Sequence, residues 1–383
     1  MTELQSRINE ILKFFDNNDI SLGYRKLLDC IIDTQDLSLY EDAIELTDWK
    51  EKFPEETEEI IQRSKSILEK VSKKDIKPYK TDESTIKVDV INKSYGTNKF
   101  SLGPISLEIK KGDVYGLVGE NGNGKTTLLR ILAKEISHDS GDIVYNFEET
   151  PNSTYDLRTK LVYIPQRTKK WYGSLKDNLK FVLSSYGVNP KENETRVLMM
   201  IARMGLWNYK HLKWSELSSG YKMRFELART LLRKPEVLLL DEPLANLDVL
   251  AQQLILEDLK SICNSINNPI ALILSSQQLY EVEKVSDKVI YLENGKQNDE
   301  IEDKKDTDAK LIIEIDSTVE REPLEQSLHH LQLDKLIYNG GIYIAYFDAS
   351  TSFSSVMKSL GEHNIEVTYI RNISQSTRRF FVS

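Results

Sequence analysis

The chain has 383 residues, enough for two or three domains of about 150 residues each. Hydrophobic residues make up 40% and charged residues 29%, with 17 glycines and 10 prolines, which excludes a collagen-like, low-complexity or wholly disordered chain. The 51 basic and 60 acidic residues give a net charge of −9, which argues against nucleic acid as the main partner because phosphate contacts need a basic face.

Cysteine usage and hydropathy exclude further classes. The two cysteines, Cys30 and Cys263, form no C-x-x-C pair, so we expect no zinc site or disulfide framework and a reducing cytosol as the compartment. The polar N-terminus, MTELQSRINE, is not typical of a signal peptide. No run approaches eighteen apolar residues, so we expect the chain to work at a membrane only through another protein.

Residues 1–74 are predicted to form a helical N-terminal domain. Apolar residues recur at helical spacing from Leu4 to Phe15 and from Leu22 to Ile32, and Pro54 followed by two acids predicts the start of another helix. Residues 36–60 contain ten acidic and two basic residues. A solvated acidic face explains this bias, and a docking surface for a basic partner is the alternative.

Residues 75–85 are charged, contain Pro78 and lack an apolar period, which predicts a linker. From residue 86 to about 300, short β-branched runs alternate with helical stretches. Such alternation predicts parallel pairing in an α/β domain. The predicted strands are IKVDVI, VYGLVG, KLVYIP, EVLLLD, IALILS and KVIYL.

Residues 309–383 follow a polar stretch and predict a third, α+β domain. The order of elements is βαββαβ, which is the ferredoxin-like arrangement, and its residues form no catalytic set, so we expect a binding or dimerisation module. The predicted elements are the strand LIIEID, a helix over Glu322–Leu331, the strand KLIY, a turn at Asn339-Gly340-Gly341, the strand IYIAYF, a helix over Phe353–Leu360 and the strand IEVTYI.

A glycine-rich loop stands between the strand VYGLV and the apolar helix LLRILAK. Glycines let backbone N–H groups turn towards phosphate oxygens, Lys125 can reach the terminal phosphates, and Thr126 can offer its hydroxyl to Mg²⁺. Strand, loop and helix come in the order that this motif needs, which favours a nucleotide site over a flexible turn. The sequence that fits G-x-x-x-x-G-K-[ST] is Gly119-Glu120-Asn121-Gly122-Asn123-Gly124-Lys125-Thr126-Thr127.

Two carboxylates follow the apolar run in EVLLLDE. Asp241 and Glu242 stand at the C-terminal end of a predicted buried strand, where ligands of open α/β sheets lie. Asp241 is placed to hold Mg²⁺, and Glu242 to polarise a water towards the γ-phosphate. Alone, the two acids could cap the next helix; with the phosphate loop they predict ATP hydrolysis.

With these motifs in order, residues 86–296 resemble the nucleotide-binding subunits of the ABC ATPase family. Gln166 in LVYIPQ matches the glutamine loop, and Tyr95 sits where the family stacks adenine on an aromatic ring. The resemblance assigns nucleotide contacts to Tyr95, the phosphate loop, Gln166 and the signature serines and glycine, and metal contacts to Thr126, Gln166 and Asp241. The two other matching segments are the signature sequence Leu217-Ser218-Ser219-Gly220-Tyr221 and the D-loop Ala245-Asn246-Leu247-Asp248.

Three positions depart from the family pattern. Ser219 and Tyr221 replace the usual Gly and Gln of the signature, while Ser218 and Gly220 remain. The switch histidine is replaced by Gln277, since the family's acids match Glu281 and Glu283. A glutamine can donate a hydrogen bond to the γ-phosphate but cannot become a cation. We therefore expect Lys125, Glu242 and Gln277 to be the catalytic residues of an ATPase with slow turnover.

The resemblance also implies partners. ATP with Mg²⁺ would lie between two subunits arranged head to tail, with Lys125 and Asp241 of one facing Ser218 and Gly220 of the other. A separate transmembrane permease subunit would meet the segment WYGSLKDNLKF, which begins at Trp171, and the protein would be cytoplasmic and peripheral to the inner face of the membrane. No nucleic acid is expected.

The sequence thus predicts an α/β P-loop ABC ATPase domain with a helical N-terminal domain and an α+β ferredoxin-like C-terminal domain. The predicted function is a subunit that powers a transporter, with export as the expected direction. The single cassette, the lack of a membrane segment and the appended C-terminal unit favour this function. The alternatives are a soluble ABC ATPase acting on a non-membrane partner, and a slow-turnover nucleotide-binding regulator that Gln277 would explain.

Overall fold

The structure is a computed structural model, and it describes residues 2–79, 83–96, 100–279, 282, 285–298, 311–339 and 341–374. The chain divides into two compact units, of which the first comprises residues 1–277 and 284–297 and the second comprises residues 278–283 and 298–383. The helical N-terminal segment therefore shares a unit with the cassette, the α/β segment that follows it. Residues 80–82 of the predicted linker lie outside the described residues.

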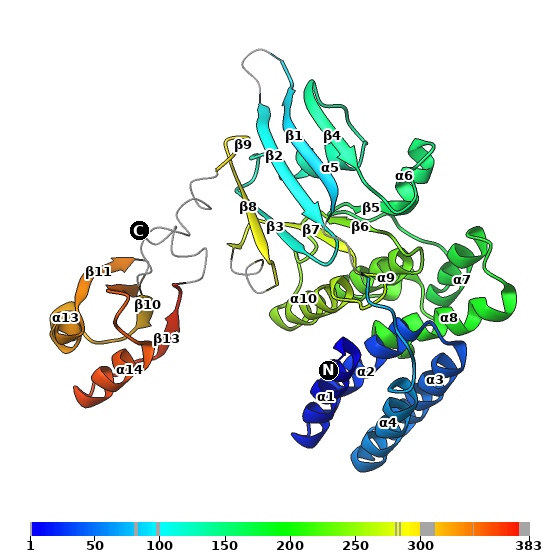
Figure 1. Ribbon diagram of the computed structural model, residues 1–383, viewed down its shortest axis with the longest axis horizontal. Helices are drawn as coiled ribbons and strands as arrows, with labels where there is room; N and C mark the ends of the chain where they lie inside the picture. Colours follow the sequence, from blue (N-terminus) through cyan, green and yellow to red (C-terminus); the bar gives the residue numbers. More distant parts are fainter. Residues whose placement is uncertain are drawn as a thin grey trace. The chain divides into compact units, whose positions relative to one another are not determined.

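The N-terminal segment is a bundle of helices (Figure 1). Side chains of Thr2, Asp19 and Asp36 accept hydrogen bonds from backbone N–H groups in the first turns of three of them, which fixes where each begins. Pro54 does not start a helix as predicted, because the preceding helix extends to Lys52 and the turn between the two helices takes up Pro54. The helices are α1 Glu3–Asp16, α2 Ile20–Thr34, α3 Leu37–Lys52 and α4 Thr57–Val71.

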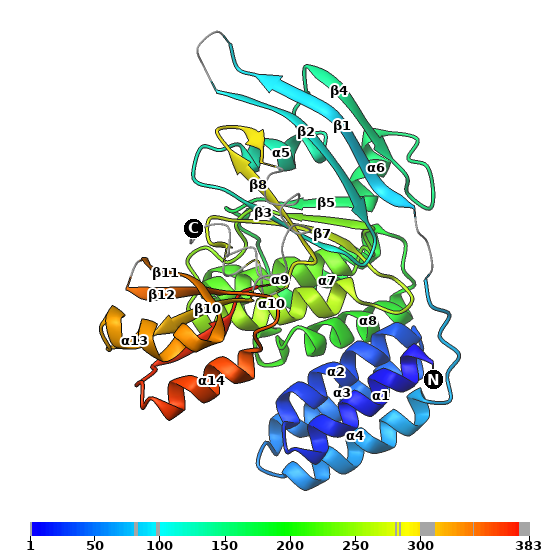
Figure 2. The same ribbon diagram turned by 60° about the vertical axis from the view of Figure 1, so that its left-hand side comes forward.

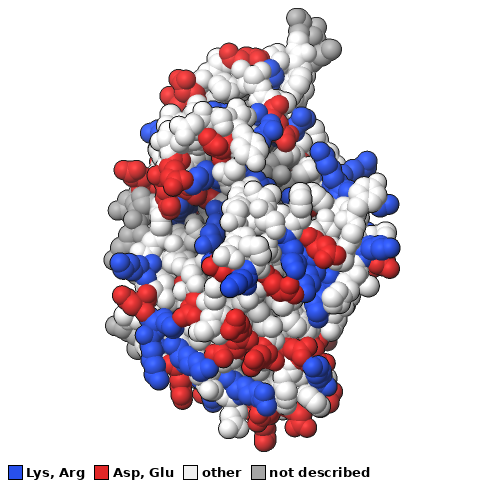
Figure 3. Space-filling model, turned by 90° about the vertical axis from the view of Figure 1, so that its right-hand side faces the viewer, with Lys and Arg blue, Asp and Glu red and all other residues white. Residues whose placement is uncertain are grey.

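Part of the acidic stretch at 36–60 forms ion pairs within this bundle. Lys74, Lys70 and Lys52 lie 2.5, 2.6 and 2.6 Å from Asp36, Asp42 and Asp48. On the face in Figure 3, acidic and basic side chains alternate over the lower part, where the bundle lies. This arrangement fits a solvated face better than a docking surface for a basic partner.

The cassette contains two sheets. The larger has the strand order β5-β6-β7-β3-β8-β9 and is parallel from β5 to β8, as the alternation of strands and helices predicts. The smaller, of order β2-β1-β4, is antiparallel, so the prediction of parallel pairing was wrong for IKVDVI. The strands are β1 Ser84–Ser94, β2 Ser101–Lys110, β3 Val114–Val118, β4 Ser140–Tyr145, β5 Leu161–Ile164, β6 Val237–Leu240, β7 Ala271–Ser276, β8 Lys288–Glu293 and β9 Lys296–Gln297.

Helices complete the cassette. A hydrophobic core joins the two sheets around Leu128 and Leu129 of α5, which follows the phosphate loop. In Figures 1 and 2, helices α7 to α10 lie between the larger sheet and the N-terminal bundle. The helices are α5 Lys125–Leu132, α6 Thr154–Lys160, α7 Leu175–Ser185, α8 Pro190–Arg203, α9 Ser219–Leu231 and α10 Val249–Cys263, with short 3₁₀ turns at Trp207–Tyr209 and Trp214–Glu216.

Buried charges join the N-terminal bundle to the cassette. The Asp258 side chain of α10 is 2% exposed and receives Arg25 of α2 and Arg203 of α8, each at 2.9 Å, and Arg224 of α9 at 3.4 Å. Arg203 also pairs with Asp29 of α2. Because buried charges are costly unless they are paired, these contacts hold α2 against α8 and α10, and Arg224 of α9 shares the Asp258 carboxylate.

The second unit has the predicted ferredoxin-like topology. Its strands are antiparallel in the order β11-β12-β10-β13, and α13 and α14 pack together against a core that includes Ile313, Leu324 and Val356. The last strand begins at Tyr369, later than predicted, because its partner β10 ends at Asp316 opposite Tyr369. The elements are β10 Leu311–Asp316, α13 Arg321–Leu328, a 3₁₀ turn His329–Leu331, β11 Leu333–Asn339, β12 Ile342–Phe347, α14 Phe353–Glu362 and β13 Tyr369–Asn372.

The predicted turn at 339–341 includes Gly340, which lies outside the described residues. Within the described part of the chain, no helix combines the length and apolar character that a membrane span requires.

Candidate nucleotide site

The phosphate loop joins β3 to α5. Gly124 precedes the helix at φ +98°, a left-handed conformation that favours glycine. A Cβ on Gly119 would lie 2.4 Å from the Leu292 carbonyl oxygen, so that position also excludes a side chain. The Asn123 side chain donates to the same oxygen at 3.1 Å and accepts from the Asn294 amide at 3.2 Å. These contacts fix the loop against the β8–β9 turn and point Asn123 at the protein.

The buried Lys125 ammonium lies inside this loop. It donates to the carbonyl oxygens of Gly119 at 2.6 Å and Glu120 at 3.2 Å, and lies 3.6 Å from Glu242 Oε1. The backbone N–H groups at the N-terminus of α5 favour an anion, and the Lys125 ammonium adds a positive charge beside them.

Asp241 follows the last residue of β6 and lies beside the start of α5. Its carboxylate accepts hydrogen bonds from Thr126 Oγ1 at 2.8 Å, Ser275 Oγ at 2.9 Å and Tyr163 OH at 3.1 Å. Burial and the negative charge of Asp241 raise the pKa of Tyr163, so the phenol stays protonated as a donor. The sequence prediction included Thr126 and missed Ser275 and Tyr163, although both stand on strands that flank β6.

Glu242 is held in a left-handed backbone conformation at φ +47°, unusual for a residue with a side chain. Its amide donates to Ser275 Oγ at 2.9 Å. Gln166 donates to Glu242 Oε2 at 2.7 Å, and Gln277 donates to both carboxylate oxygens at 3.0 and 3.1 Å. The structure thus brings Lys125, Glu242 and Gln277 together with Gln166. Glu281 and Glu283, which located the switch position in the sequence, lie outside the described residues.

Tyr95 lies apart from this cluster at the end of the β1 strand. Its side chain is half-exposed, and its ring centre lies 6.5 Å from that of Phe100. Phe100 in turn covers Gly124, since a Cβ there would meet the Phe100 ring at 2.8 Å. The Tyr95 and Phe100 rings therefore form a row between the exposed surface and the phosphate loop.

The signature-like residues face the D-loop of their own chain. Ser218 caps α9 by accepting from the Tyr221 amide at 3.3 Å, and Ser219 Oγ donates to the Asn246 carbonyl at 3.2 Å. Tyr221, which replaces the family's Gln, stacks on Tyr209 at 3.9 Å. Gly220 packs beside α10, where a Cβ would lie 3.4 Å from that of Ala251. The signature-like residues therefore contact the D-loop and α10, whereas the phosphate loop contacts the β8–β9 turn.

The predicted permease-facing aromatics differ in their surroundings. Trp171 donates to Glu226 Oε1 at 2.7 Å and stacks on Arg229 at 4.6 Å, so it packs locally. Tyr172, the other predicted contact, is 83% exposed, and Phe181 at the end of the same segment is 71% exposed.

Comparison with known proteins extends these observations. Residues 102–245 match the family model described as ABC transporter. The lantibiotic transport ATP-binding protein SrtF of Streptococcus pyogenes is 32% identical over 214 residues, which cover 55% of this chain and 88% of SrtF. The sulfate/thiosulfate import ATP-binding protein CysA of Vibrio cholerae is 33% identical over 217 residues, which cover 55% of this chain and 57% of CysA. The chain thus spans about half the length of that relative.

A solved structure gives the same result for the cassette. The protein cbiO1 of Clostridium perfringens, part of the ABC transporter complex cbiONQ, aligns with a TM-score of 0.53 and 25% identity over 58% of this chain and 92% of that chain. The matched family segment contains the phosphate loop, Gln166, the signature-like sequence and Glu242. The chain therefore belongs to the ABC transporter family of ATP-binding proteins.

Proposed function

We propose that the chain is the ATP-binding and hydrolysing subunit of a membrane transporter and that ATP drives two cassettes together. The observation that carries this proposal is the contact between the phosphate loop and the two carboxylates that follow β6. Lys125 lies 3.6 Å from Glu242, and Thr126 lies 2.8 Å from Asp241. Relatives named for sulfate/thiosulfate import and for lantibiotic transport both match the cassette. Because these relatives differ in what they are named for, the proposal concerns the use of ATP to power transport, and export stays a prediction from the sequence.

The residues of the site have distinct roles in this proposal. Lys125 exchanges its carbonyl partners for the terminal phosphates of ATP, and backbone N–H groups at the start of α5 bind phosphate oxygens. Tyr95 stacks on adenine. Glu242 accepts the proton of the attacking water, and the amides of Gln166 and Gln277 orient its carboxylate.

The oxygen donors of the site suit Mg²⁺. The Thr126 hydroxyl and the Asp241 carboxylate are hard ligands within hydrogen-bond distance of each other, and the Gln166 side chain reaches the neighbouring Glu242. We infer that Thr126, Gln166 and Asp241 hold the ion, directly or through water. When bound, Mg²⁺ neutralises charge on the phosphates.

A second subunit completes the site. Ser218, Ser219 and Gly220 lie beside the D-loop and α10 of their own chain, and in a head-to-tail pair they contact the ATP held by the other copy. The neutral Gln277 makes turnover slow, because an amide cannot supply positive charge to the γ-phosphate. A separate transmembrane permease binds Tyr172 and the neighbouring exposed surface on the inner face of the membrane.

Phosphate release with Mg-ATP tests the catalytic part. Glu242→Gln preserves shape and removes the base, so we expect hydrolysis to fall by at least a hundredfold while ATP binding persists and a dimer accumulates in size-exclusion chromatography. Glu149→Gln, at an exposed glutamate paired with Lys160, is the matched control and should leave the rate unchanged. Robust hydrolysis by Glu242→Gln would overturn the assignment of the base.

Capture from detergent-solubilised membranes tests the transporter part. The chain should retain a protein with several membrane spans, and replacing the exposed Tyr172 and Phe181 by serine should release it. Capture that is indifferent to both substitutions, or that yields only proteins without membrane spans, would favour the soluble ATPase instead.

A further inference from the structure

A cavity of about 680 Å³ lies between the N-terminal bundle and the cassette. From the bundle, the lining comes mainly from α2, with Arg7 of α1 and Tyr40 of α3. From the cassette, it comes from α7 and α8, the ends of α9 and α10, and the segment that joins α10 to β7. Its volume is typical of small-molecule sites, and domain interfaces are where such sites are often found. It is separate from the nucleotide residues described above, none of which lines it.

Most of the cavity surface is apolar. The apolar side chains come from the bundle and from three parts of the cassette, so a ligand would touch both. Methionine side chains adapt to ligands of different shapes. The apolar lining includes Ile32, Leu183, Val188, Met199, Met200 and Ile262.

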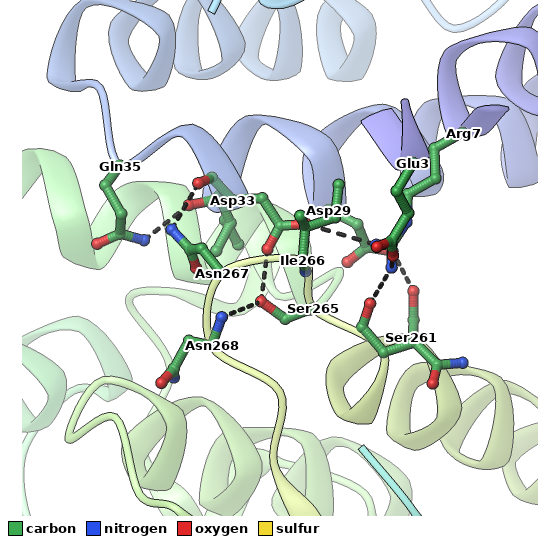
Figure 4. Close-up of polar contacts among 12 residues, drawn as sticks. Glu3, Arg7, Asp29, Asp33, Gln35, Ser261, Ser265, Ile266, Asn267 and Asn268 are labelled. Carbon is green, nitrogen blue, oxygen red and sulfur yellow. Dashed lines mark hydrogen bonds and ion pairs between the residues drawn. The ribbon is translucent and has the colours of Figure 1, made fainter. Parts of the chain in front are cut away.

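Two of the cavity's carboxylates are already satisfied by the protein, as Figure 4 shows. Asp33 accepts from Ser265 Oγ at 2.5 Å and from the Ile266 amide at 3.1 Å, and it pairs with Arg7. Asp29 accepts from Ser261 Oγ. Arg203 pairs with Asp29 as well, so neither carboxylate offers a free site for a ligand cation.

Cations outnumber carboxylates around the cavity. Lys234 donates to the neutral Gln35 Oε1 at 2.6 Å, and among the described residues no carboxylate forms an ion pair with it. Burial and the nearby positive charge of Arg196 lower its pKa. The lining cations are Arg7, Arg196, Arg203, Arg233 and Lys234, against Asp29, Asp33 and Glu192. Three of these cations are already paired: Arg7 with Glu3 and Asp33, Arg196 with Glu192 at 3.1 Å, and Arg203 with Asp29 and Asp258. Among the described residues, Arg233 and Lys234 are therefore the lining cations without a carboxylate partner.

We propose that this cavity binds a small organic anion with an apolar body, with its charged group at Lys234 beside Arg196 and its apolar part against Met199 and Met200. An alkyl carboxylate has this chemistry. Such a ligand gains both from the burial of apolar area and from a cation that has no carboxylate partner of its own.

Calorimetry on the full chain without nucleotide tests this site with three probes that share one alkyl chain: octanoate, octan-1-ol and octylammonium. We expect octanoate to bind about tenfold more tightly than octan-1-ol and octylammonium to bind most weakly. Lys234→Gln should weaken octanoate by about fivefold to tenfold and leave octan-1-ol unchanged. Lys87→Gln, on β1 outside the cavity, is the matched control.

Two further variants locate the binding. Met200→Trp fills the apolar end and should weaken octanoate and octan-1-ol alike, in protein whose melting curve shows it folded. Lys125→Ala should retain octanoate binding, which separates the cavity from the phosphate loop. The proposal is overturned by absence of octanoate binding at millimolar concentration, by equal affinity for the three probes, or by indifference to both Lys234→Gln and Met200→Trp.

Discussion

Gln166 and Gln277 approach the Glu242 carboxylate from two different strand ends, and each donates through its side-chain amide. These two donors fix the orientation of the carboxylate, which a general base requires. Both donors are neutral, so the positive charge beside Glu242 comes from Lys125 at 3.6 Å. The rate of hydrolysis should therefore respond to charge at position 277.

Gln277→His tests this dependence. An imidazole can become a cation near neutral pH, so it can orient and neutralise the γ-phosphate better than an amide. We expect steady-state phosphate release to rise several-fold, and more at pH 6 than at pH 8. Gln253→His, on the exposed face of α10, controls for the new histidine. A rate that equals the unsubstituted protein at both pH values would contradict slow turnover through Gln277.

Tyr95 offers a second residue-level test. Stacking between an aromatic ring and adenine is worth on the order of 1 kcal/mol, so Tyr95→Ala should weaken ATP binding several-fold while Tyr95→Phe should not. Titration calorimetry with ATP measures both. Tyr155→Ala, at a 77% exposed tyrosine, is the control. Equal affinities for Tyr95→Ala and Tyr95→Phe would place adenine elsewhere.

At the scale of elements, the local motifs, the parallel pairing of the larger sheet and the topology of the second unit were predictable, and the antiparallel pairing of the smaller sheet was not. The phosphate loop and the strand before Asp241 carry their own signals, namely glycines, an apolar run and the residues that follow it. Nothing in IKVDVI distinguishes an antiparallel from a parallel strand, because the direction of pairing depends on β2 and β4, which lie outside this segment. Likewise α3 has apolar residues among many acids, and only packing against α8 and α4 reveals them as a buried face.

The segment that joins α10 to β7 makes a pH-dependent contact with α2. Burial raises the pKa of Asp33 to about 6, so the folded protein holds this proton more tightly than the unfolded chain does. Stability from this group is therefore greatest at low pH and is lost as the pH rises through about 6.

Asp33→Asn should remove that dependence. Relative to the variant, the unsubstituted protein should lose roughly 1 to 1.5 kcal/mol of unfolding free energy between pH 5 and pH 7.5, since one pKa unit corresponds to about 1.4 kcal/mol. Urea unfolding at the two pH values measures the difference. The control is Asp16→Asn, at an exposed pair with Lys65. If the unfolding free energy of the unsubstituted protein and of Asp33→Asn changes equally with pH, the raised pKa of Asp33 is contradicted.

At the scale of the molecule, the contacts that unite the bundle with the cassette join residues far apart in the chain. Arg25 and Asp258 are 233 positions apart, and Arg203 and Asp29 are 174 apart. Sequence periodicity reports only on near neighbours, so it could predict two separate domains but not the buried charges between them.

Asp258→Asn tests whether bundle and cassette unfold together. Three arginines would lose their shared carboxylate, and breaking a buried pair costs about 3 to 5 kcal/mol. We expect a lower thermal midpoint and simultaneous loss of hydrogen-exchange protection in α2 and α10. Asp48→Asn, at the exposed pair with Lys52, should cost less than about 1 kcal/mol. Loss of protection in α10 alone would show that the bundle is independent.

The position of Asp33 has a mechanical consequence. The D-loop ends at Asp248, which caps α10, a helix of 15 residues and so roughly 22 Å long, and the segment after α10 leads through β7 to Gln277. Between these two ends, Asp33 accepts hydrogen bonds from Ser265 and Ile266, and Arg7 donates to the Asn264 carbonyl. A displacement of the D-loop relative to Gln277 would therefore have to move the bundle together with α10 or break the hydrogen bonds to Asp33.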